Sequence, residues 1–82
     1  EPGYYKKEKF GIRIENLVYV KKIGKKKFFE NLTFVPIENE LVNFKLLTPS
    51  EKNYLFNYHL NVYSNISKYL EPKEKKWLAT FI

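Results

Sequence analysis

Apolar and polar residues alternate over much of the first half of the chain, a pattern typical of β-strands with one buried face. The clearest strand pattern covers residues 11–20, which begin with Gly11 and are rich in Val, Ile and Tyr. Before it, Tyr4 and Tyr5 predict a short extended arm, and the polar residues 6–9 predict a connecting loop. We therefore expect a hairpin that begins with a Glu-Pro-Gly turn at residues 1–3.

The strand pattern is interrupted at residues 21–27, where five lysines surround Gly24. A segment this charged predicts a solvated loop, with a phosphate-binding patch as the alternative. Alternation resumes in residues 28–37, and Pro36 lacks the N–H that a central strand needs, so the strand ends there or runs along an edge. Residues 38–47 alternate weakly and predict a short strand or an extended connection.

Residues 48–51, Thr-Pro-Ser-Glu, carry the strongest local signal in the chain. Thr at the N-cap, Pro at the first helical position and Glu at the third complete a capping box, so a helix begins here. Apolar side chains then recur every three or four residues until the Glu-Pro pair at 71–72, and residues 73–81 predict a second short helix. The expected fold class is α+β, with antiparallel strands followed by a long helix and a short C-terminal helix.

The composition limits the class of protein. With 82 residues, the chain forms at most one small domain with a thin core. It has no cysteine, so carboxylates and the single His59 are the available metal ligands. No apolar run approaches the roughly 18 residues needed to span a bilayer, and no signal sequence is present, so a cytoplasmic location is the default. The first residue is Glu rather than Met, and we expect a piece of a longer sequence.

The formal charge of +6 is compatible with binding to nucleic acid or to an anionic membrane. However, Lys, Asn, Ile, Tyr and Phe are all abundant, as in proteins encoded by AT-rich genomes, where Lys fills solvated positions. The charge alone therefore does not define a partner.

Arg13 and Glu15 are two residues apart, so they fall on one face of the predicted strand. Burying both charges is costly unless each is paired or ligated. Taken alone, they are interpreted as a structural pair or as strand-edge charges, and Glu1 as an ordinary turn acid. His59 lies near the apolar stripe of the predicted helix and is interpreted as a packed or surface residue.

Two groups of motifs resemble a known family. Residues 1–5, Glu-Pro-Gly-Tyr-Tyr, followed by residues 10–16, Phe-Gly-Ile-Arg-Ile-Glu-Asn, resemble the end of the active site of the Xaa-Pro aminopeptidases. These enzymes belong to the pita-bread metallopeptidases, which also include methionine aminopeptidase and prolidase. Residues 29–37, 47–48 and 57–59 resemble the C-terminal extension of the longer, cytosolic-type aminopeptidase P enzymes.

The resemblance implies roles for four residues. Glu1 would ligate one of two divalent metals and take part in proton transfer, and Glu15 would bridge both metals. Arg13 would line the catalytic site, with Tyr5 near it. The remaining ligands of the family, two aspartates and a histidine, lie upstream in family members and are absent from this chain, and His59 is left outside the metal site.

The resemblance also implies a domain division and a function. Residues 1–22 would be the end of the catalytic domain, carrying two metal-ligand carboxylates, and residues 23–82 would be the C-terminal subdomain. The enzyme would remove an N-terminal residue that precedes proline, using two divalent ions, with Mn²⁺ expected and Zn²⁺ or Co²⁺ as alternatives. Expected partners are peptides with proline in the second position and a second copy in a homodimer, rather than a membrane or nucleic acid. The fragment alone is expected to be inactive because it carries only part of the ligand set.

Two other functions stay open on the sequence. The charge and the interleaved aromatic residues suggest a small basic module that binds nucleic acid. Alternatively, the C-terminal helices form an oligomerisation subdomain without catalysis.

Overall fold

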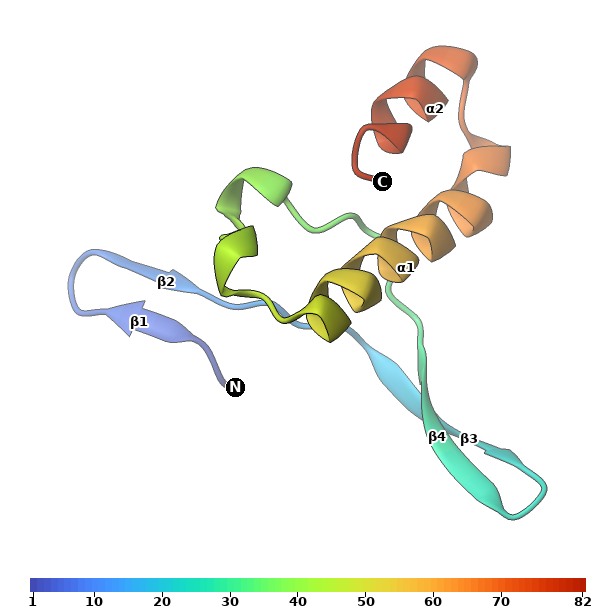
Figure 1. The fold of residues 1–82 in the computed structure, drawn as a ribbon, viewed down its shortest axis with the longest axis horizontal. Coiled ribbons are helices and arrows are strands. Elements are labelled where there is room, and N and C mark those ends of the chain that lie inside the picture. Colours follow the sequence, from blue (N-terminus) through green and yellow to red (C-terminus); the bar gives the residue numbers. More distant parts are fainter. The chain divides into compact units, whose positions relative to one another are not determined.

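Two antiparallel strand pairs precede a long helix and a short one in the computed structural model, which describes residues 1–82 (Figure 1). This order confirms the predicted α+β class. The chain divides into two compact units, residues 1–33 with both hairpins and residues 34–82 with the helices. Each unit is considered in turn.

The first hairpin pairs β1 (Tyr4–Lys6) with β2 (Phe10–Ile12), and Tyr4 lies opposite Ile12. Its turn is closed by a 3.0 Å hydrogen bond from the Lys9 N–H to the Lys6 carbonyl, and Glu8 adopts the left-handed conformation with φ of 59°. The predicted hairpin with a polar connecting loop is therefore confirmed.

The second hairpin pairs β3 (Val18–Ile23) with β4 (Lys26–Asn31). The prediction of a solvated loop over residues 21–27 is wrong, because these residues form the tip of this hairpin. Gly24 has a φ of 60°, which lets a two-residue turn reverse the chain. The lysine side chains stay exposed while their backbone groups pair across the ladder, so charge did not prevent strand formation. Lysines along exposed edges also discourage pairing with other strands.

The predicted continuous strand over residues 11–20 is also wrong. Strand pairing stops after Ile12 and resumes at Val18, and residues 13–17 have no strand partner. The first hairpin offers no partner beyond Ile12, because β1 begins at Tyr4, the residue opposite Ile12. The second hairpin offers a strand partner only from Val18 onwards, where Asn31 lies opposite. The apolar alternation was present, but a strand needs a neighbouring strand to satisfy its backbone groups.

The strand predicted over residues 28–37 is shorter than expected, because β4 ends at Asn31. The Asn31 side chain accepts a 3.2 Å hydrogen bond from the Thr33 N–H, a local bond that replaces ladder pairing. Residues 38–47 were predicted as a short strand or an extended connection, and the structure instead has two 3₁₀ turns, η1 (Asn39–Leu41) and η2 (Phe44–Leu46). Side chains of the residues before these turns, Glu38 and Asn43, accept from backbone N–H groups within them.

The long helix α1 (Pro49–Ile66) begins at the predicted capping box and continues into the 3₁₀ turn η3 (Ser67–Tyr69). The Glu51 N–H donates to Thr48 Oγ1 at 3.1 Å, and the Thr48 N–H donates to Glu51 Oε1 at 2.8 Å. The bond from the Thr48 backbone lowers the pKa of Glu51. The short helix α2 (Pro72–Ala79) has its own capping box, between Glu71 and Glu74. None of these helices has the length and apolar character that crossing a membrane requires.

Replacing Thr48 with Ala is expected to lower the free energy of unfolding by about 1 kcal/mol, because the first turn of α1 loses its side-chain acceptor. Urea unfolding followed by helix circular dichroism measures the effect. Ser50→Ala is the matched control, because Ser50 is exposed and lies in the same turn. Equal stabilities for the two variants would show that the cap does not stabilise the helix.

The core lies entirely in residues 34–82. Tyr58, Val62 and Leu78 form its buried centre, and the partly buried side chains around them are Ile37, Tyr63, Ile66, Leu70 and Phe81. Residues 1–33 contain no buried residue. Leu17 is 68% exposed and Phe29 is 75% exposed, and a lone two-stranded hairpin is marginally stable in water. The two hairpins therefore lack the apolar partner that a larger sheet would provide.

Candidate metal centre

Glu1 and Arg13 lie at the open end of the first hairpin and contact each other. Glu1 precedes β1 and Arg13 follows β2, so the register that sets Tyr4 opposite Ile12 brings their segments side by side. Arg13 Nη1 donates to Glu1 Oε2 in an ion pair, with the side chains 40% and 75% exposed, respectively. An exposed pair of this kind contributes little stability, so its main consequence is the placement of the Glu1 carboxylate.

Gly3 allows the backbone and side chains around this pair to approach closely. A Cβ atom at Gly3 would lie 2.7 Å from the Ile12 carbonyl oxygen, 2.8 Å from Arg13 Cγ and 3.0 Å from Tyr5 Oη. Tyr5 Oη also donates a 3.3 Å hydrogen bond to the Glu1 carbonyl. Glu1, Tyr5 and Arg13 therefore gather around a position that only glycine fits without displacement.

Glu15 lies in the segment between β2 and β3 that has no strand pairing. Its side chain is exposed, and no hydrogen bond or ion pair joins it to Glu1 or Arg13. Sequence reasoning proposed Arg13 as a neighbour of Glu15 on one strand face, whereas the structure pairs Arg13 with Glu1. The structure thus brings together two of the three candidates.

The donor set is compatible with part of a divalent metal site. Carboxylate oxygens are the ligands that hard divalent ions prefer, and both Glu1 and Glu15 are exposed to a ligand. No group of three or more His, Asp or Glu side chains in the chain is arranged to hold a metal ion. The two carboxylates therefore fit such a site only together with ligands from elsewhere.

His59 belongs to the helical unit and is 3% exposed. Its Nε2 accepts a 3.0 Å hydrogen bond from the Ile37 N–H, and burial lowers the pKa of the imidazole. The preceding residue, Tyr58, donates from Oη to the Val35 carbonyl at 2.6 Å. The sequence analysis interpreted His59 as a packed or surface residue and missed these bonds. The sequence did carry one signal for such bonds: two adjacent residues of the apolar helix stripe end in polar atoms, which need partners when they are buried.

The comparisons with known proteins identify the family. Residues 27–81 match the family described as the C-terminal region of peptidase M24, and the chain belongs to it. A probable Xaa-Pro aminopeptidase P from Pyrenophora teres f. teres is 48% identical over 79 residues, which cover 87% of this chain and 12% of that relative. A putative Xaa-Pro aminopeptidase from Saccharomyces cerevisiae is 43% identical over 83 residues, which cover 95% of this chain and 11% of that relative. The predicted resemblance is thus confirmed.

A third relative, an uncharacterized peptidase from Schizosaccharomyces pombe, is 37% identical over 87 residues, covering 96% of this chain and 14% of that relative. No solved structure matches the chain. The chain spans only 11–14% of the length of these curated relatives. The predicted domain division between residues 22 and 23 concerns such a longer protein and stays a prediction. The two compact units of this chain are a different division, which falls between residues 33 and 34.

Proposed function

We propose that the chain is the C-terminal part of a dinuclear metal-dependent aminopeptidase that removes an N-terminal residue preceding proline. The observation that carries this proposal is the similarity to relatives named as Xaa-Pro aminopeptidases, which extends over 87–95% of the chain. The proposal concerns the longer protein, because the relatives are much longer than this chain.

In the proposed enzyme, Glu1 and Glu15 are metal ligands and Arg13 positions one of them. The ion pair from Arg13 engages one oxygen of Glu1, Oε2, and leaves Oε1 for a metal. Glu15 has neither oxygen engaged within the chain, which suits a carboxylate that bridges two ions. Bound divalent ions would supply Lewis-acid catalysis and a water of lowered pKa as nucleophile. Mn²⁺ is the proposed metal, with Zn²⁺ and Co²⁺ as alternatives.

Glu1 has a second proposed role in proton transfer. Its side chain is 75% exposed, so water or substrate can reach the carboxylate. Pro2 restricts the backbone next to Glu1, and the missing side chain of Gly3 lets Tyr5 and Arg13 approach closely. The substrate is a peptide with proline second, whose scissile imide bond has no N–H to donate.

The exposure of the strands in residues 1–33 supports the proposal that they belong to a larger sheet in the longer enzyme. Their apolar side chains lack a core of their own, and further strands of the longer enzyme would cover them. The proposal also includes a cytosolic location, which suits a chain without cysteine. A homodimer remains an expectation; Trp77 on α2 is 59% exposed and is available for such a contact.

The isolated chain is expected to have no peptidase activity on an Xaa-Pro peptide with added Mn²⁺, because two carboxylates are only part of a dinuclear ligand set. A fluorogenic Xaa-Pro assay of the isolated chain, run beside the longer enzyme, measures this. Turnover by the isolated chain above a metal-only blank would contradict the proposed division of ligands.

A nucleic-acid-binding module is the second candidate function. The observation that favours it is the β3–β4 hairpin, where Lys22 lies opposite Lys27 among five exposed lysines without an ion-pair partner. A mobility shift of a single-stranded oligonucleotide that weakens with salt and with Lys22→Ser/Lys27→Ser would support this function. We expect no such shift, because edge protection already explains the lysines.

A further inference from the structure

Two neighbouring side chains of α1 hold residues 35–37 against the helix. Tyr58 donates to the Val35 carbonyl at 2.6 Å, and His59 accepts from the Ile37 N–H at 3.0 Å. Tyr58 and His59 are 6% and 3% exposed, so both bonds are shielded from competing water. The bond to His59 requires a lone pair on Nε2, which only the neutral ring provides.

The His59 ring also contacts the residues that follow α2. Its centroid lies 5.9 Å from the Phe81 ring centroid, and the imidazole forms a backbone hydrogen bond with Phe81. One imidazole thus joins three separate pieces of the unit: residues 35–37, α1 and the C-terminal residues. It is the only histidine of the chain.

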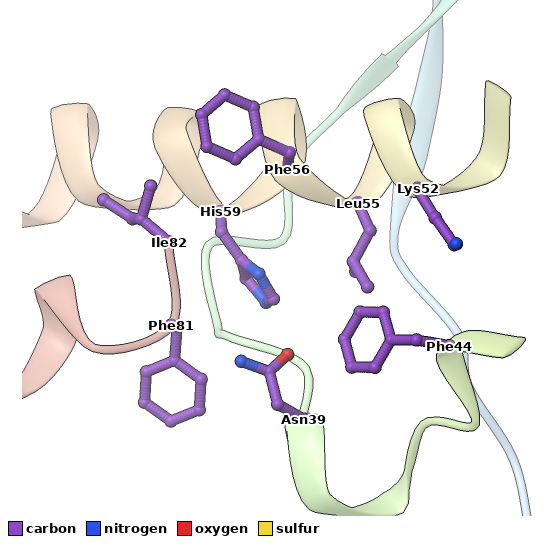
Figure 2. Close-up of a pocket in the computed structure, with 8 residues that line it drawn as sticks. All are labelled: Asn39, Phe44, Lys52, Leu55, Phe56, His59, Phe81 and Ile82. Carbon is purple, nitrogen blue, oxygen red and sulfur yellow. The ribbon is translucent and has the colours of Figure 1, made fainter. Parts of the chain in front are cut away.

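A cavity of about 220 Å³ lies against the ring and gives a proton a route to it without unfolding of the unit (Figure 2). The figure shows the His59 ring extending from α1 into the space that Phe44 and Asn39 border from below. Lys52, also on α1, is the only charged side chain in the lining, and the phenol of Tyr58 lies beside the ring. No Asp or Glu side chain lines the cavity.

We propose that the hydrogen bonds of Tyr58 and His59 form a latch that holds residues 35–37 against α1. Protonation of His59 in mildly acidic solution breaks the second of these bonds, the one to the Ile37 N–H. A proton on Nε2 removes the acceptor and places two donors face to face, so the Ile37 N–H must turn away. The hydrogen bond from Tyr58 to the Val35 carbonyl does not involve the imidazole, so Val35 stays attached to α1. The structure thus assigns to this unit a pH-dependent loosening that lies beyond the proposed catalysis.

The direction of the pH effect follows from the burial of the ring. Burial lowers the pKa of His59 below its ordinary value of 6.5, and the backbone groups of Ile37 and Phe81 oppose this only in part. The unfolded chain therefore takes up its proton first as the pH falls. The contribution of the latch to stability is complete above about pH 6.5 and is lost as the pH falls towards the lowered pKa of the folded state.

NMR of the 82-residue chain between pH 8 and pH 5 tests the proposal, because the single imidazole gives an unambiguous signal. We expect the His59 midpoint below 6.5, and loss of hydrogen-exchange protection at the Ile37 amide with the same midpoint while the amides of α1 stay protected. His59→Gln keeps an acceptor without a titrating proton, so its Ile37 protection should not change with pH. His59→Leu should lack the protection at every pH.

Constant protection at Ile37 through the His59 titration, or the same pH response in His59→Gln, would overturn the proposal. If the isolated chain does not fold at pH 7, the comparison is made in the longer enzyme by hydrogen exchange and mass spectrometry of residues 34–45. The same pH-dependent rise in exchange, absent from His59→Gln, is expected there. Its absence in the parent enzyme would likewise overturn the proposal.

Discussion

Replacing Glu15 with Gln in the longer enzyme is expected to lower kcat/KM for an Xaa-Pro peptide at least about 100-fold. Removing an outer partner of a metal ligand already lowers metal affinity or activity about 10–100-fold, and loss of a bridging carboxylate should exceed that. Gln keeps the shape of the side chain but removes its charge, so it cannot offset the charge of two divalent ions. The rate is measured with Mn²⁺ held at a fixed excess.

The matched control is Glu30→Gln. Glu30 lies on β4 opposite Tyr19, in the same unit but outside the candidate site, and its replacement should change kcat/KM by less than about twofold. Circular dichroism of both variants separates loss of ligation from loss of fold. A Glu15→Gln enzyme that retains full kcat/KM would remove Glu15 from the metal centre. Partial rescue at higher Mn²⁺ would support a ligand role over a substrate contact.

Replacing Leu78 with Ala is expected to unfold much of the helical unit. Leu78 is 4% exposed and packs with Tyr58 and Val62, and a buried Leu→Ala change loses about 2–5 kcal/mol of stability. A unit this small rarely has more than about 3–5 kcal/mol in total. Thermal and urea unfolding followed by circular dichroism at the helix band measure the loss.

Leu46→Ala is the control for this change, because it removes the same atoms from a side chain outside the core. Leu46 lies in η2 and is 79% exposed. Its effect should stay within about 0.5 kcal/mol. Equal losses for the two variants would contradict a core centred on α1 and α2.

The elements that the sequence predicted well are those encoded by local chemistry. The capping box at Thr48 needs only residues within one turn, so the start of α1 was predictable, and the same holds for the polar turn between β1 and β2. Strand extent could not be predicted, because a strand ends where its partner ends. Residues 13–16 have a strand pattern but no strand partner within this chain, and of residues 13–17 only Leu17 bonds across to the β4 side, where its carbonyl accepts from the Leu32 N–H at 2.8 Å.

The neighbours within the candidate site also depended on strand extent, so the sequence did not predict them correctly. Period-2 alternation placed Arg13 beside Glu15, and this inference required residues 11–20 to be one straight strand. Once pairing stops at Ile12, the register of the first hairpin decides the neighbours, and it sets Arg13 against Glu1. The bonds from Tyr58 and His59 to residues 35–37 join positions more than 20 residues apart in the chain, so a local pattern could show the polar atoms on α1 but not the residues to which they bond.

The most direct test of the proposed metal centre is an anomalous-scattering crystal structure of the longer enzyme grown with Mn²⁺. We expect two anomalous peaks, both in contact with the carboxylate of Glu15 and one of them in contact with Glu1. Arg13 should still contact Glu1. Manganese bound away from both carboxylates, with Glu1 and Glu15 turned to solvent, would contradict the proposal that this chain supplies two ligands of a dinuclear aminopeptidase.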